Sequence, residues 1–212
     1  MKVMIFNDKN NFEGSLSIIN KDRPQGTRRF WQIEKYHGFF FRKVCGFMQP
    51  FADHVELVKT YVYTGKYNKK AMDAMKKYCG KDIRMMNDLI RNEEDLLQGI
   101  SNTDIQLELK KRIETHVDSL KRLFEDIKSE RINAIEKQEK HSKGQVAMTE
   151  YLNELPFTQL KTTPLKHTAG YIHQKGVDVL ISTDLVNLAH CNAYDIAIVL
   201  GGDADLLESI KL

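Results

Sequence analysis

The sequence has few of the residues that define disulfide-rich and zinc-binding proteins. Its 212 residues include only 3 cysteines and 4 prolines. The cysteines, Cys45, Cys79 and Cys191, are odd in number and widely spaced, with no Cys-x-x-Cys pair and no histidine cluster. Such a pattern indicates neither a disulfide framework nor a zinc site. A reducing, cytoplasmic environment is therefore the default expectation.

Long apolar runs are also missing. No run approaches the roughly 20 residues that a membrane-spanning helix needs, and residues 1–10 are too short and polar for a signal peptide. The glycines form no phosphate-binding loop motif, and no serine or cysteine lies in a nucleophile signature. These absences give no support to membrane function and leave no competing catalytic motif.

Charge and composition are ordinary for a globular protein. The chain is 42% hydrophobic and 29% charged, with a formal net charge of +3. A chain of this length can bury an ample core. The small positive charge permits a nucleic-acid partner without requiring one.

Four carboxylates gather in the last forty residues. Asp178 and Asp184 lie within a helical pattern over 177–188, and Asp203 and Asp205 follow an apolar run, Ile196–Leu200, that ends in two glycines. The run is typical of a buried parallel strand. Like charges a few ångströms apart cannot all stay ionised unless a cation lies among them. A divalent metal is the simplest such cation.

Asp184 falls inside the apolar stripe of its predicted helix. Leu180, Ile181 and Leu188 are its neighbours at spacings of three and four, so its carboxylate is predicted to face inward. Two interpretations stay open. Asp184 is either a structural acid paired with a buried lysine or arginine, or a member of a functional site.

The N-terminus supplies a second acidic strand end. The pattern predicts a short buried strand at Val3–Phe6, followed directly by Asp8 and Asn11. In open α/β sheets, ligands bind beyond the carboxyl ends of the strands. Two parallel strands would bring Asp8 and Asn11 to Asp203 and Asp205. The alternative for a single such aspartate is a turn or a helix cap.

Together these residues resemble the NYN domains of the PIN-like nuclease superfamily. The family pattern is a first strand followed by Asp-x-x-Asn, here Asp8 to Asn11. Next comes Lys-Gly-Val-Asp opening a helix that carries another aspartate, here Lys175 to Asp178 and Asp184. An apolar strand then leads into Gly-Asp-x-Asp, here Gly202 to Asp205. The resemblance implies an α/β, PIN-like (Rossmann-like) three-layer core with a parallel sheet.

The resemblance also implies a metal-dependent nuclease that usually acts on RNA. Asp8, Asp178, Asp203 and Asp205 would be the catalytic carboxylates around Mg²⁺ or Mn²⁺, and Asn11 and Asp184 would support them. Oxygen-liganded cations stabilise charge on the attacking and leaving oxygens of a phosphodiester and lower the pKa of the attacking water. Lys175, just before a helix N-terminus, would contact phosphate; a solvated lysine is the alternative.

The sequence departs from the family pattern in two places. Gly201 stands where a small hydroxyl residue is common, which would remove a hydrogen bond to metal-bound water or phosphate. The sequence also ends at Leu212, whereas family members usually continue through another helix and strand. The sequence is therefore expected to be either a trimmed piece of a longer protein or a domain with a shortened sheet, and the completeness of the substrate groove stays open.

A basic, aromatic stretch offers a second RNA contact. Arg28 and Arg29 precede Phe30 and Trp31, and Phe39–Lys43 continues the stretch. Arginines hold phosphate and aromatic rings stack bases. The favoured alternative is core packing, because apolar residues here recur at near-helical spacing, namely Ile33, Tyr36, Phe40 and Val44.

Between the two acidic segments the pattern is helical. We predict a discontinuous nuclease core, 1–66 and 150–212, with further strands at 55–63 and 158–165, and a helical insertion at 67–149. Helical stripes end at Gly80 and Gly99, and Ser101–Asp104 is typical of a capping box before a long helix with coiled-coil spacings.

The insertion has three interpretations. A hairpin packed against itself or the sheet is favoured over an arm that forms a homodimer or binds a protein partner. For the mixed-charge tail 128–143, a solvated face is favoured over a clamp for a nucleic acid or a protein partner.

The leading hypothesis is a metal-dependent endoribonuclease acting on single-stranded RNA. The rival is a non-catalytic RNA- or protein-binding module in which the acids hold a structural cation and the helical arm mediates assembly. Cleavage of DNA flaps or of phosphate esters by the same site is a third reading.

Overall fold

The computed structural model describes residues 1–24, 32–101 and 107–211, and the chain divides into two compact units. The first comprises 1–67, 144–165 and 173–212, and the second 68–143 and 166–172. Elements of the first unit are β1 (Lys2–Asp8), α1 (Lys9–Lys21), α2 (Ile33–Met48), β2 (Glu56–Lys66), β3 (Thr158–Pro164), α5 (Val177–His190), β6 (Ile196–Leu200), the short 3-10 helix η2 (Ala204–Leu206) and α6 (Leu207–Lys211).

The first unit is built on a parallel sheet with strand order β3-β2-β1-β6. This confirms the predicted α/β class, and the predicted strands at 3–6, 55–63, 158–165 and 196–200 each correspond to one strand of this sheet. The register pairs Asp8 of β1 with Tyr63 of β2, and Tyr63 with Lys161 of β3. Because β1 also pairs with β6, the acidic ends of the two strands are neighbours.

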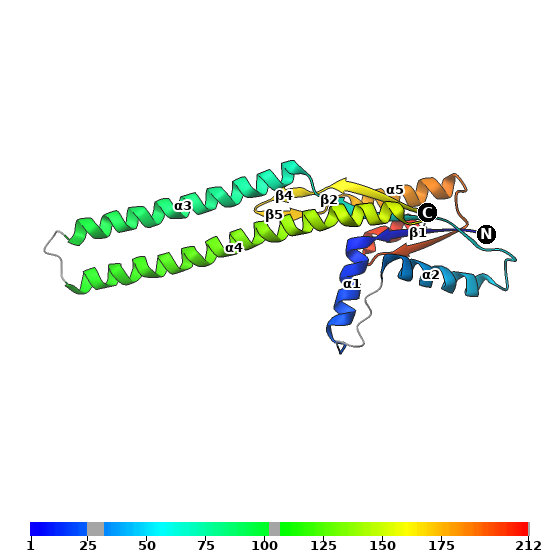
Figure 1. The fold of residues 1–212 in the computed structure, drawn as a ribbon, viewed down its shortest axis with the longest axis horizontal. Helices are drawn as coiled ribbons and strands as arrows, with labels where there is room; N and C mark the ends of the chain where they lie inside the picture. The colour runs from blue at the N-terminus through cyan, green and yellow to red at the C-terminus, as the bar shows by residue number, and fades with distance from the viewer. Residues whose placement is uncertain (25–31, 102–106, 212) are drawn as a thin grey trace. The chain divides into compact units, whose positions relative to one another are not determined.

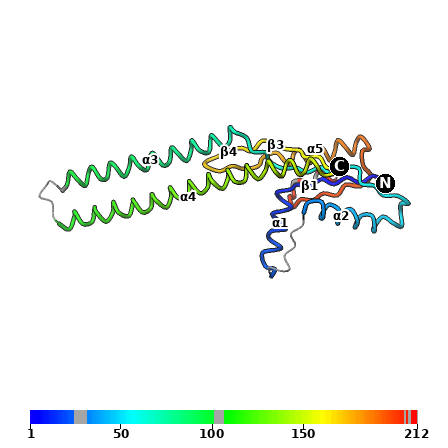
Figure 2. Tube along the Cα trace, viewed as in Figure 1, coloured from blue at the N-terminus to red at the C-terminus, as the bar shows by residue number. Residues whose placement is uncertain are grey.

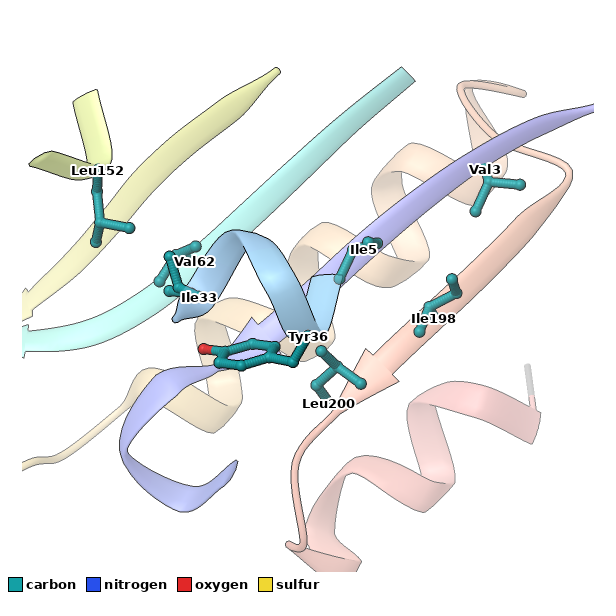
Figure 3. Packing of buried hydrophobic residues seen from close by; sticks show 8 residues of the cluster. All are labelled: Val3, Ile5, Ile33, Tyr36, Val62, Leu152, Ile198 and Leu200. Atoms are coloured by element: carbon teal, nitrogen blue, oxygen red, sulfur yellow. The ribbon is translucent and has the colours of Figure 1, made fainter. Parts of the chain in front are cut away.

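Both faces of the sheet are covered, which makes three layers. Side chains alternate along β1, so Val3 and Ile5 pack on one face and Met4 and Phe6 on the other. The first face carries α2 and the end of α4 through the cluster drawn in Figure 3, which comprises Val3, Ile5, Ile33, Tyr36, Val62, Leu152, Ile198 and Leu200. The second carries α5 through Val177, Ile181 and Leu185.

Several apolar and aromatic residues of α2 belong to this core, although Phe47, near the end of the helix, is exposed. Ile33 and Tyr36 are buried, and Phe40 and Val44 are half-buried and pack against the same cluster. The core interpretation of this segment is confirmed. Arg28 and Arg29, proposed from the sequence to contact RNA, lie outside the described residues.

The second unit is a helical hairpin with a small β-ribbon. Its elements are α3 (Lys69–Ser101), most of α4 (Leu107–Glu154), β4 (Lys166–Thr168) and most of β5 (Tyr171–His173). The helices α3 and α4 run side by side in opposite directions (Figure 1), and the Cα trace in Figure 2 shows the same pairing. Among the described residues, none of the helices combines the length and the apolar character that a membrane crossing requires.

One helix boundary differs from the sequence prediction. The helix predicted to end at Gly80 continues to Ser101, so that prediction is wrong. Glycine is common just after a helix but is tolerated within one when packing holds the flanking turns. Here Met75 and Cys79 are buried directly before it. The predicted capping box lies largely at 102–106, outside the described residues.

Replacing Gly80 with alanine is expected to stabilise the hairpin. A Cβ at Gly80 would meet no atom within 4 Å, and alanine in a helix interior is favoured over glycine by roughly 0.5–1 kcal/mol. Urea unfolding followed by circular dichroism measures this gain in free energy. Gly176→Ala is the contrasting control, because Gly176 has φ of 83° and its replacement should destabilise. A loss of stability in Gly80→Ala would contradict a continuous α3.

Candidate functional site

The site begins where β1 runs into α1. Asp8 is the last residue of β1 and only 2% exposed. Its side chain caps α1, because Oδ1 accepts a hydrogen bond of 3.1 Å from the backbone N–H of Asn11. The helix-cap alternative left open by the sequence is therefore realised, and it places Asn11 in the first turn of α1, close to the Asp8 carboxylate.

The end of β6 lies against the same two residues. A Cβ built on Gly201 would lie 3.6 Å from the Cβ of Asp8, and one built on Gly202 would lie 3.4 Å from Oδ1 of Asn11. Asp203 follows immediately and is half-buried. These are ordinary van der Waals distances, so the end of β6 lies directly against Asp8 and Asn11, as the parallel pairing of β1 and β6 predicts.

Asp178 reaches the site from α5. It lies in the first turn of that helix, after Gly176, which adopts the left-handed conformation at the N-cap. Burial raises the pKa of the Asp8 carboxyl, and the nearby charges of Asp178 and Asp203 raise it further, against the lowering effect of backbone N–H donors. The structure therefore brings Asp8, Asp178 and Asp203 within electrostatic range of one another. We call these three residues the acid cluster.

The segment before α5 is held by a glutamine that sequence analysis did not single out. Oε1 of Gln174 accepts hydrogen bonds from the backbone N–H of Gly65 (2.9 Å) and from Nδ2 of Asn10 (2.7 Å). Gln174 thus ties the loop to the first turn of α1 and to the end of β2. The next residue, Lys175, is exposed, which suits contact with a phosphate in solvent.

Asp184 has partners of its own. Its Oδ2 accepts hydrogen bonds from Nζ of Lys161 (2.6 Å) and from the hydroxyl of Tyr63 (2.8 Å). The Lys161 ammonium also lies 4.5 Å from the centroid of the Tyr61 ring. The structural ion pair that the sequence left open as one interpretation of Asp184 is therefore present.

The ion pair of Asp184 is linked to the acid cluster through the sheet. Lys161, Tyr63 and Asp8 lie in register on adjacent strands. Tyr63 is fully buried, and burial together with the Asp184 carboxylate raises its pKa far above the ordinary tyrosine value, so it stays a hydrogen-bond donor. Sequence reasoning missed both Tyr63 and Lys161; the only local signal is their position near the carboxyl ends of predicted strands.

A second polar group lies behind the site, on the opposite face of β1. Nδ2 of the buried Asn7 lies 3.0 Å from the Tyr36 hydroxyl and 3.1 Å from Nε2 of His37. Burial lowers the pKa of His37 to about 4, so its ring is neutral at physiological pH. These contacts join β1, just before Asp8, to α2.

The chemistry of these donors fits a hard divalent cation. Carboxylate and amide oxygens are the ligands that Mg²⁺ and Mn²⁺ take in proteins, and a cation would relieve the repulsion that acts on Asp8. The described side chains contain no group of three His, Cys, Asp or Glu residues already closed around a metal position. Asp205 lies in η2, and its side chain is outside the described set.

Comparison with known proteins gives one match. The family model of the NYN domain matches residues 101–211, a stretch that contains α5, β6 and four of the predicted site aspartates but not Asp8 or Asn11. No curated protein and no solved structure matches the chain significantly. The matched stretch covers more than half of the 212 residues. The chain therefore belongs to the NYN domain family, within the PIN-like nuclease superfamily.

Proposed function

We propose that this protein is a divalent-metal-dependent endoribonuclease that cleaves single-stranded RNA. The observation that carries the proposal is the environment of Asp8. This carboxylate is 2% exposed, and its pKa is raised by burial and then by the charges of Asp178 and Asp203. A buried carboxylate crowded by two others costs stability unless it serves a bound cation. Membership of a nuclease family supports the same reading.

In this proposal Asp8, Asp178, Asp203 and Asp205 hold Mg²⁺ or Mn²⁺. The bound cation would stabilise charge on the phosphodiester oxygens and lower the pKa of the attacking water. The protein itself holds the carboxylate ligands in position. Asp8 is held by its capping bond to Asn11, and Asp178 by the helix that follows Gly176.

Other residues orient the substrate and the donors. Asn11 presents its side-chain oxygen beside Gly202, where it can align a ligand at the end of β6. Lys175 is exposed next to the N-terminus of α5, and its ammonium together with the helix dipole attracts an RNA phosphate. Asp184, paired with Lys161, acts on the site through the position of α5.

A cleavage assay with a matched variant tests the proposal. End-labelled single-stranded RNA is incubated with the protein and Mn²⁺ or Mg²⁺, with EDTA as the metal control and Asp203→Asn as the site control. We expect metal-dependent cleavage that falls at least about 100-fold in the variant, while the circular dichroism spectrum is unchanged. Duplex RNA, flap DNA and a simple phosphate ester, run in parallel, define the substrate class.

Two results would contradict the proposal. A folded protein that cleaves no substrate with either metal, yet binds RNA equally well before and after Asp203→Asn, would support the non-catalytic binding module. Cleavage that survives both EDTA and the substitution would place the activity outside the acid cluster.

A further inference from the structure

The end of β2 extends past the end of β1. The register between the two strands ends with Asp8 of β1 opposite Tyr63 of β2, and Gly65 lies two residues farther along β2. Hydrogen-bonding groups point to alternate sides of a strand, and those of the next residue, Lys66, point to the side of β3, where its C=O accepts the N–H of Leu165. The N–H and C=O of Gly65 therefore point to the side of β1. Gly65 is buried, so both groups need partners.

Two glutamines supply these partners. Oε1 of Gln174 accepts the N–H of Gly65 (2.9 Å), and Nε2 of Gln145 donates to the C=O of Gly65. Gln145 belongs to α4, and its Oε1 accepts the backbone N–H of Tyr67 (2.8 Å), so its contacts hold the end of β2 and the residues that follow it. Gln174 instead lies just before α5, the helix that carries Asp178.

Gln174 also contacts the segment that follows Asp8. Its Oε1 accepts a second hydrogen bond, from Nδ2 of Asn10 (2.7 Å) in the first turn of α1. The hydroxyl of Thr64 donates to Oδ1 of the same asparagine (3.4 Å), which orients its amide. Because Gly65 and Asn10 both present N–H donors, the amide oxygen of Gln174 faces them. One atom of Gln174 therefore joins the loop before α5 to β2 and to α1.

The loop between Gln174 and Asp178 is fixed at both ends. Gln174 holds its start through the two hydrogen bonds, and Val177 is fully buried at its end. Between them, Gly176 adopts the left-handed conformation, with φ of 83°, as the N-cap of α5. Asp178 follows Val177 directly, in the first turn of the helix. The position of its carboxylate relative to Asp8 therefore depends on Gln174.

We propose that Gln174 is a positioning residue for the metal site, which holds Asp178 beside Asp8 so that both carboxylates can bind one cation. The inference rests on the proposed function. The charges of the two aspartates oppose each other, so they stay together only because the segments that carry them are tied. Groups that orient metal ligands change metal affinity by roughly 10- to 100-fold when they are lost.

Mn²⁺ binding by the full chain, measured from the electron paramagnetic resonance signal of free Mn²⁺, tests the proposal. Gln174→Leu removes the acceptor, and we expect the dissociation constant of Mn²⁺ to rise at least about 10-fold. Gln145→Leu is the matched control, because it removes two hydrogen bonds from the same end of β2 and none from the loop before α5. Both variants should lower the melting temperature in EDTA, and only Gln174→Leu should weaken Mn²⁺ binding.

Two further variants and the cleavage rate separate positioning from stability. Gln174→Glu keeps the oxygen acceptor and should bind Mn²⁺ at least as tightly as the wild type. Asn10→Ala leaves the contact with Gly65 in place, removes the more exposed hydrogen bond of Gln174 and should weaken binding about 3-fold. Because the carboxylate ligands are intact, cleavage by Gln174→Leu should recover at saturating Mn²⁺, whereas cleavage by Asp203→Asn should not.

The outcomes separate this inference from the proposed function. A wild type that binds no Mn²⁺ would overturn both. A wild type that binds Mn²⁺ and cleaves RNA, with Gln174→Leu no weaker in Mn²⁺ binding than Gln145→Leu, would overturn the inference alone. A Gln174→Glu variant that binds Mn²⁺ as weakly as Gln174→Leu would also overturn it, because the lost acceptor would then not be the cause.

Discussion

Asp8→Asn is expected to abolish metal-dependent cleavage and, in EDTA, to make the protein more stable than the wild type. Asparagine is as good a helix cap as aspartate, so the bond to Asn11 is kept. The substitution removes a charge that burial and the other two acids disfavour. We expect cleavage to fall at least about 100-fold while the melting temperature in EDTA rises.

The gain in stability should depend on pH in a defined direction. The pKa of Asp8 in the folded state is raised, so the protonated form favours folding. Without metal, the wild type therefore loses stability as pH rises from the ordinary aspartate range through the raised folded-state pKa, and the variant does not. The difference in melting temperature between Asp8→Asn and the wild type should grow as pH rises through this range and should be constant at lower pH.

Added metal and a second substitution serve as controls. Mn²⁺ or Mg²⁺ should raise the melting temperature of the wild type and not that of Asp8→Asn, because the ligand is lost. Asp8→Ala also removes the helix cap and should be less stable than Asp8→Asn by about 1 kcal/mol. A variant that keeps full activity, or one that is less stable than the wild type in EDTA at every pH, would refute the role assigned to Asp8.

Lys161→Met is expected to cost about 2 kcal/mol of unfolding free energy, because it leaves the carboxylate of Asp184 without its cation in a mostly buried position. The side chains of Lys161 and Asp184 are 25% and 15% exposed, which places the cost below that of a fully buried pair. The ammonium also lies over the Tyr61 ring, and that contact is lost as well. Urea unfolding measures the change.

Two further variants separate the effect of the Lys161–Asp184 ion pair from other effects of the substitution. Adding Asp184→Asn to Lys161→Met removes the unpaired charge, so the double variant should recover part of the lost stability. Lys70→Met, at an exposed position on α3, should change the free energy by less than about 0.5 kcal/mol. If Lys161→Met and Lys70→Met had equal effects, Asp184 would not depend on this lysine.

Local patterns were sufficient for the predictions that concern single elements. The apolar runs at Val3–Phe6 and Ile196–Leu200 were correctly predicted as parallel strands because a strand buried on both faces carries an uninterrupted apolar run. Parallel strands end at one edge of a sheet, so the proximity of Asp8 to Asp203 followed from the same pattern. The end predicted at Gly80 was wrong because glycine has only a weak local preference, which the packing of the hairpin overrides.

The sequence by itself determined the parallel α/β core and the strand ends at which the carboxylates gather, because both depend on short-range periodicity. Only the tertiary structure decided which partners those side chains take. The ion pair of Asp184 with Lys161 depends on the register of β3, and the loop held by Gln174 depends on where β2 ends. The antiparallel register of the hairpin likewise depends on three ion pairs between α3 and α4. Contacts between residues far apart in the chain follow from register and packing, which no local pattern of residues encodes.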